Sequence, residues 1–173
     1  MEVLIVIVVI GVLAAMMILS GTESVTTAQA AKILANLQTL KRAAAQWYLD
    51  NSEKVQPNGT VMLNGQAKPV QEWGDQIQLS KYISSMNDSG IKFHTTESDT
   101  NSKNQNTNLA EGYYGLCNGS NAWYVGYCFK SGEKKVRDKI RNLQSSAGVF
   151  LGTADAREDN VNNTSAAVWM RVL

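Results

Sequence analysis

The chain opens with an almost uninterrupted run of apolar residues. Residues 1–19, MEVLIVIVVIGVLAAMMIL, contain one charged residue, Glu2, and one glycine, Gly11. As a helix rising 1.5 Å per residue, positions 3–19 would extend about 25 Å, slightly less than the roughly 30 Å hydrocarbon core of a bilayer. Because this run is apolar on every side, it needs lipid or other apolar helices around it.

The pattern changes after this run, but helical periodicity continues. Alanines are frequent between residues 22 and 50 and favour a helix. Larger apolar side chains recur there every three or four positions, at Ile33, Leu37, Leu40, Ala44 and Trp47. We therefore predict one continuous helix to about Leu49, apolar all round in its first half and amphipathic in its second.

Short apolar segments and turn residues follow the long helix. Asn64 and Gly65 separate residues 60–63 from residues 68–70 and predict a small hairpin, because this dipeptide favours a two-residue turn. Residues 72–85 predict a short helix. Residues 95–108 contain no large apolar side chain and predict an exposed loop.

Aromatic residues dominate the next segment. Residues 113–129 predict a hairpin at the centre of an antiparallel sheet, with its turn at residues 118–121. Residues 148–152 predict a short strand or a buried connection, and residues 165–173 predict a closing strand after a polar loop at residues 153–164.

These elements predict an α+β fold with three to five antiparallel strands. A long N-terminal α-helix packs on an antiparallel β-sheet head in this prediction. Residues 1–21 form the apolar half of the helix, which needs lipid or other copies of itself around it. Residues 22–173 form the head, which includes the amphipathic half of the helix.

The formal net charge of +1 gives no argument for a nucleic-acid or acidic partner, but charge is concentrated in one place. Residues 133–146 predict a helix with Val136, Ile140 and Leu143 on one face. Residues 130–141 hold six basic and two acidic side chains. A solvated helix face explains this pattern; contact with an acidic surface or with DNA is the alternative. No aromatic residue lies within this segment to stack on bases.

The two cysteines, Cys117 and Cys128, flank the turn of the aromatic hairpin. A pair of cysteines in an exported protein predicts a disulfide that pins the hairpin, and two thiols are the alternative. The pair is too few for a structural zinc site, and His94 is far away in sequence.

The chain offers little for catalysis. His94 is the only histidine, and no glycine-rich phosphate loop precedes a predicted helix. Asp155, Glu158 and Asp159 could collect calcium weakly, although solvation of a surface loop explains them more simply. We therefore predict no enzyme, no catalytic residue, no metal site, no cofactor and no small-molecule substrate.

Three general interpretations of the N-terminal run fit poorly. A secretory signal peptide carries basic residues before its apolar core, whereas the first basic residue here is Lys32. A simple anchor usually has basic flanks, and residues 20–23 have none. A core helix of a soluble domain rarely contains seventeen consecutive uncharged residues, as positions 3–19 do.

The order of residues at 2–15, EVLIVIVVIGVLAA, resembles the mature N-terminus of type IV pilins and pseudopilins. In that family a prepilin peptidase removes a leader, the new N-terminal residue is methylated, and a glutamate follows at the fifth position. Glu2 takes the position of that glutamate, so the resemblance implies three further motif residues before Met1. The family's helix proline is replaced here by Ser20 and Gly21, which with Gly11 are the expected flexible points.

The resemblance implies a structural function. The apolar helix would hold the subunit in the inner membrane and then pack with copies of itself in a helical filament. Glu2 would neutralise the N-terminal amine of a neighbouring subunit. The expected partners are the prepilin peptidase and the pilus assembly machinery, and the expected location is an extracellular pilus with an inner-membrane pool.

Two other functions remain open at this point. A pseudopilin of a type II secretion or DNA-uptake system shares the same N-terminus, but is usually shorter and often lacks a disulfide. A membrane-anchored periplasmic binding module, with Trp73 and Trp123 lining a groove, comes from a different class and leaves Glu2 unexplained. The sequence favours the major subunit of a type IV pilus, whose head serves adhesion or self-association.

Overall fold

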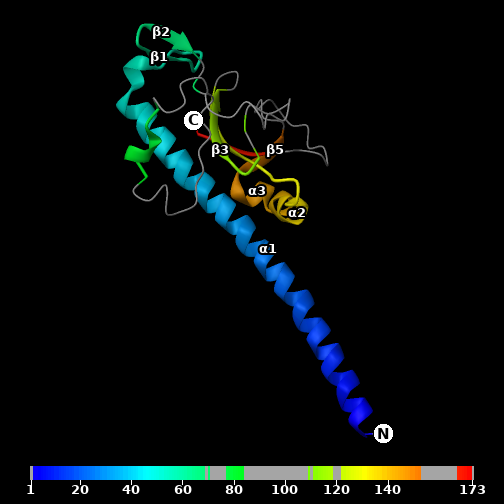
Figure 1. The fold of residues 1–173 in the computed structure, drawn as a ribbon. Coiled ribbons are helices and arrows are strands. Elements are labelled where there is room, and N and C mark those ends of the chain that lie inside the picture. Colours follow the sequence, from blue (N-terminus) through cyan, green and yellow to red (C-terminus); the bar gives the residue numbers. More distant parts are fainter. Residues whose placement is uncertain are drawn as a thin grey trace.

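The computed structural model describes residues 2–68, 70, 77–83, 109, 111–118, 122–152 and 167–172. Its longest element is helix α1, Glu2–Asp50, which is unbroken over 49 residues, or about 70 Å. The N-terminal half of α1 projects beyond the head, and the C-terminal half packs against it (Figure 1). The predicted continuous helix is confirmed.

The amphipathic half of α1 is held by one apolar face. The buried positions on this face follow the predicted helical spacing: Ala30, Ile33, Leu37, Leu40, Ala43, Ala44 and Trp47. After Asp50, both the backbone N–H and the side-chain amide of Asn51 donate to the carbonyl of Trp47, each at 3.0 Å. The chain then turns into the short 3₁₀ helix η1, Ser52–Lys54, and leaves the helix axis.

A two-stranded hairpin lies at the end of α1 farthest from the N-terminus (Figure 1). Strands β1, Val61–Leu63, and β2, Gln66–Lys68, are antiparallel. Asn64 and Gly65 between them have φ values of 50° and 75°, which a two-residue turn of this kind requires. The predicted hairpin is confirmed, with its second strand starting at Gln66.

The segment predicted as a short helix is described over residues 77–83, which contain the 3₁₀ helix η4, Leu79–Lys81. The hydroxyl of Tyr82 after it donates to the Asp50 carboxylate at 2.8 Å and ties this segment to the end of α1.

The main sheet has four antiparallel strands in the order β3-β4-β6-β5. The aromatic hairpin supplies β3, Tyr114–Asn118, and β4, Trp123–Cys128; β5, Val149–Gly152, and β6, Ala167–Arg171, complete it. The α+β class and the antiparallel pairing are confirmed. The hairpin is not central as a whole, because β6 joins only one side of it and leaves β3 last in the sheet order.

The two faces of this sheet pack differently. One face lies on α1 and forms the main core with side chains such as Leu116, Val125 and Val168. The opposite face carries a smaller cluster made of Leu109, Cys128, Ala167 and Trp169, with Tyr113, Cys117, Tyr124 and Phe150 packed around it.

The helix predicted over residues 133–146 is two helices. Helix α2 spans Lys134–Asn142 and α3 spans Gln144–Ala147, with Leu143 between them at φ −99° and ψ 0°. Val136 and Ile140 are buried as predicted, whereas Leu143 at the break is 36% exposed. The helical face predicted for all three residues therefore holds for two of them.

The predicted disulfide between Cys117 and Cys128 is wrong for this structure, because no bond joins the two sulfurs. Cys117 lies opposite Tyr124 in the β3–β4 ladder, next to the turn. Cys128 lies four residues farther along β4, which is about 13 Å at the usual strand rise. A disulfide needs Cα atoms about 4.4–6.8 Å apart. The two cysteines share a face of the sheet but not a cross-strand position.

Several expectations fall outside the described residues. These are the loops at 95–108 and 153–164, residues 72–76 and 84–85 of the predicted short helix, and the candidate residues Trp73, His94, Asp155, Glu158 and Asp159.

Candidate assembly surface

The exposed part of α1 is the most unusual surface of the molecule. Of the side chains described in its first fourteen residues, nine large apolar ones are 49–73% exposed: Val3, Ile5, Val6, Ile7, Val8, Val9, Ile10, Val12 and Leu13. Positions 5–10 follow one another without a gap, so they point in all directions around the helix axis. We call this stretch, residues 3–13, the apolar shaft. Within the described part of the chain, no helix is long and apolar enough to cross a membrane.

Such a surface needs a partner on physical grounds. Scattered exposed apolar side chains are ordinary, whereas a contiguous apolar surface marks an interaction site. Nothing in the described head folds back to cover the apolar shaft, which points away from the head (Figure 1). Within the described residues the apolar shaft is therefore left uncovered.

The predicted assembly residues all lie on α1. Glu2 is its first residue, where unpaired backbone N–H groups favour a negative charge. The helix continues without interruption through Gly11, Ser20 and Gly21 in this single chain. A Cβ atom at Gly11 would meet nothing within 4 Å. Flexibility at these three positions in an assembled state remains a prediction.

Two hydrogen bonds and a ring contact through the core connect α1 to the head. The side-chain amide of Asn36 donates to the Tyr114 hydroxyl at 3.0 Å, inside the apolar interface. The ring centroids of Tyr114 and Tyr127 are 4.8 Å apart, and the Tyr127 hydroxyl donates to the Glu133 carboxylate at 2.9 Å. Glu133 immediately precedes α2. One set of contacts thus connects α1, the sheet and α2.

Burial governs the chemistry of the two tyrosines. It raises the pKa of Tyr114 to about 12, although the hydrogen bond from Asn36 acts in the opposite direction. Burial also raises the pKa of Tyr127, and its hydrogen bond to Glu133 adds to this effect. Both hydroxyls therefore stay protonated over the physiological range. These contacts between Asn36, Tyr114, Tyr127 and Glu133 were not predicted from the sequence. The one sequence feature that pointed to them was Asn36, a polar residue beside the apolar face of a helix.

Trp123 belongs to the core and does not line an open groove. Its side chain is 1% exposed, and its indole N–H donates to the carbonyl of Gly59 at 2.8 Å. Its ring centroid lies 5.7 Å from that of Trp47 and 5.4 Å from that of Tyr48, both on α1. This aromatic cluster stabilises the C-terminal end of α1 on the sheet.

The basic segment is mainly an exposed helix face. Lys134, Lys135 and Lys139 on α2 are exposed, and Arg141 pairs with Asp138 at 3.4 Å within the same helix. Among the described residues, no group of three His, Cys, Asp or Glu side chains is placed to hold a metal ion.

The geometry thus brings Glu2, Gly11, Ser20 and Gly21 onto one projecting helix and keeps Cys117 and Cys128 apart within the head. Comparison of the chain with protein-family models, with curated proteins and with solved structures finds no match.

Proposed function

We propose that this protein is the structural subunit of a helical filament of the type IV pilus kind, which polymerises through α1. The observation that carries the proposal is the division of α1 into two parts. Its C-terminal part is buried in an α+β head, and its N-terminal part is an apolar shaft exposed on all sides. A second copy of the same shaft offers the matching apolar surface.

The energetics of the apolar shaft favour assembly with many neighbours. Burying a Val, Leu or Ile side chain fully contributes about 1.5–3 kcal/mol, so nine half-exposed ones contribute on the order of 10 kcal/mol. Association costs about 4–15 kcal/mol in lost freedom and ordering. One neighbour covers only one side of a helix, so a stable arrangement surrounds each shaft with several others.

Glu2 would supply specificity at the tip of the apolar shaft. An unpaired carboxylate inside a bundle of apolar helices is strongly unfavourable. The N-terminal amine of an adjacent subunit would neutralise it, and the low dielectric of the bundle strengthens that attraction. The pairing would therefore set the axial offset between neighbouring subunits.

Before assembly the apolar shaft needs an apolar environment as well. We propose that the inner membrane provides it, that a prepilin peptidase processes the subunit there, and that the pilus assembly machinery extracts it. The head would remain on the outside of the filament, where it is available for adhesion or self-association.

A pseudopilin of a secretion or DNA-uptake system is the second candidate. Cys117 and Cys128 carry no disulfide, which removes one of the two sequence features that favoured a pilus subunit. The same apolar shaft would then build a short periplasmic fibre.

Electron microscopy of a sheared cell-surface fraction tests the proposal, with the fibre protein identified by mass spectrometry. We expect long, thin fibres built mainly of this chain. Fibres that form only on overproduction and remain in the periplasm would favour the pseudopilin. A protein that stays monomeric at all concentrations, in membranes or in detergent, would overturn both.

A further inference from the structure

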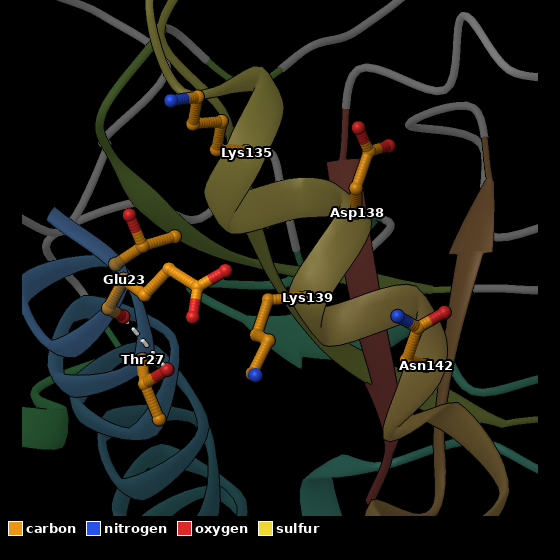
Figure 2. A pocket seen from close by; sticks show the side chains of 7 residues that line it. Glu23, Thr27, Lys135, Asp138, Lys139 and Asn142 are labelled. Atoms are coloured by element: carbon orange, nitrogen blue, oxygen red, sulfur yellow. Dashed lines mark hydrogen bonds between the residues drawn. The ribbon is translucent and has the colours of Figure 1, made fainter. Parts of the chain in front are cut away.

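A polar groove lies between α1 and α2, on the part of the head nearest the apolar shaft (Figures 1 and 2). Its cavity measures about 300 Å³. Its walls are formed by Glu23, Thr26 and Thr27 from α1 and by Lys135, Asp138, Lys139 and Asn142 from α2. The proposed polymerisation through the apolar shaft does not use this groove.

The groove presents charges of both signs. Lys135 and Lys139 are one helical turn apart on α2 and both are exposed. Figure 2 shows the side chains of Lys139 and Glu23 in the space between α1 and α2, whereas the Lys135 side chain points away from Lys139. Among the described residues, an ion pair within 4 Å joins Asp138 to Arg141, and none joins Lys139 to Glu23. The α2 wall thus carries two ammonium groups beside the Asp138 carboxylate, which is paired with Arg141, and the α1 wall carries the Glu23 carboxylate.

The distance from the groove to the apolar shaft restricts the ligand further. Glu23 follows Leu13, the last residue of the shaft, by ten positions, which is about 15 Å along the helix. Half of a bilayer's hydrocarbon core, the depth that one lipid's acyl chains occupy, is also about 15 Å. Residues 14–19 between them are apolar in sequence. An acyl chain starting at the groove would thus reach the apolar shaft.

We propose that this groove binds the headgroup of a zwitterionic phospholipid, with phosphate and primary amine groups, whose acyl chains lie along α1 toward the apolar shaft. The phosphate oxygens would accept hydrogen bonds from the ammonium group of Lys139, and Lys135, one helical turn away, would add positive charge to the same wall. The lipid ammonium group would donate to the Glu23 carboxylate. Charge-assisted bonds of this kind are the stronger ones in proteins.

The presence of Glu23 selects against the simpler ligands. A free phosphate ion or a purely anionic headgroup would gain the lysines but would be repelled by the carboxylate on the facing wall. A headgroup with both charges satisfies both walls. The apolar tail adds a hydrophobic contribution that a free ion lacks.

Native mass spectrometry of the full chain in a nonionic detergent tests the proposal, with dioleoylphosphatidylethanolamine as the probe. We expect one lipid per chain. Lys139→Gln should weaken binding about tenfold, the effect of removing a hydrogen bond to a charged group. Lys134→Gln is the matched control, because Lys134 is exposed on the same helix but does not line the groove. It should leave the dissociation constant unchanged.

Glu23→Gln tests the second wall. We expect it to remove the preference for phosphatidylethanolamine over phosphatidylglycerol while the protein still binds lipid. Thermal unfolding followed by circular dichroism checks that each variant is folded, which we expect because the three substituted side chains are all exposed.

Equal weakening by Lys134→Gln and Lys139→Gln would overturn the proposal, because it would indicate general attraction to a basic helix. Displacement of the lipid by millimolar inorganic phosphate would also overturn it in favour of a free anion site. The assay uses the isolated subunit and needs no filament, so failure to polymerise and failure to bind lipid are separate results.

Discussion

Asn36 is a polar residue in the interface that holds α1 on the sheet. Its neighbours on that helix face are apolar, and its amide is paired with a single hydroxyl, that of Tyr114. An apolar stripe with repeated spacing packs almost equally well after a shift of one helical turn. A buried hydrogen bond between two fixed positions removes that ambiguity, because any shift leaves both groups unpaired.

Asn36→Ala should lower the free energy of unfolding by about 1–3 kcal/mol, because the buried Tyr114 hydroxyl loses its partner. Urea unfolding followed by circular dichroism measures this. Gln38→Ala is the control, since Gln38 lies two residues farther along the same helix and is exposed. The double variant Asn36→Ala/Tyr114→Phe should cost less than the two single changes added together. Strict additivity would show that the two groups do not interact.

Tyr114 also predicts a pH dependence. Its pKa is raised to about 12 in the folded protein, above the usual value near 10 in an unfolded chain. A raised folded-state pKa gives stability that is complete below pH 10 and is lost as the pH rises toward 12. We expect the free energy of unfolding to fall by on the order of 2 kcal/mol across this window.

Tyr114→Phe provides the comparison for that titration. The variant should show a smaller fall between pH 9 and pH 12, with the remainder coming from Tyr127, whose pKa burial also raises. Unfolding curves at several pH values measure both proteins. Parallel pH profiles for the parent and the variant would contradict the assignment to Tyr114.

The elements of the head depend on contacts across strands that adjacent residues do not reveal. Gly126 on β4 lies opposite Trp169 on β6, and a Cβ atom at Gly126 would overlap the indole ring. The ring thus lies directly on the glycine backbone and fills the face of the sheet beside Cys128. A glycine and a tryptophan forty-three residues apart form one packing unit.

Gly126→Ala should destabilise the head by about 1–3 kcal/mol, because the Trp169 ring must move to admit the new methyl group. Tryptophan fluorescence during urea unfolding follows the change. Gly132→Ala is the matched control, since a Cβ atom there would meet nothing within 4 Å. Equal stability of the two variants would show that β6 can shift to accommodate the methyl group.

Elements governed by local periodicity could be predicted from the sequence, and contacts governed by register could not. The apolar residues spaced three or four positions apart from Ile33 to Trp47 predict α1, and Asn64 with Gly65 predicts the β1–β2 turn. The position of Cys128 relative to Cys117 depends on which residues of β3 and β4 pair, a choice made by packing on both faces. The break between α2 and α3 at Leu143 likewise could not be predicted, because no proline or glycine lies at that position.

The candidate assembly surface was predictable for a related reason. A helix that is apolar on every side can be identified in the sequence without knowing its tertiary contacts. Residues 3–13 alone therefore predict the apolar shaft. The groove between α1 and α2 depends on the angle at which a distant helix crosses, which local patterns do not encode.

At the scale of the whole molecule, the two ends of α1 have opposite requirements. The C-terminal end is satisfied within the chain by the sheet and the aromatic cluster around Trp123. The apolar shaft at the N-terminal end is covered by no described part of the chain. In the proposed function the shaft would exchange lipid for other subunits on assembly, so the difference in free energy between the two states would be small. A single interaction that exists only in the filament can then decide whether filaments form.

Glu2 is that interaction in the proposed function, and Glu2→Gln tests it with little change in side-chain volume. We expect a folded head and normal amounts of protein, but a loss of filaments by more than a hundredfold, because breaking a buried ion pair costs about 3–5 kcal/mol. Electron microscopy and immunoblotting of the sheared fraction measure the yield. Glu53→Gln removes the same charge from an exposed site on the head and should leave the yield unchanged. Abundant fibres from the Glu2 variant would mean that contacts along the apolar shaft are sufficient for assembly, and the charge pairing would have to be abandoned.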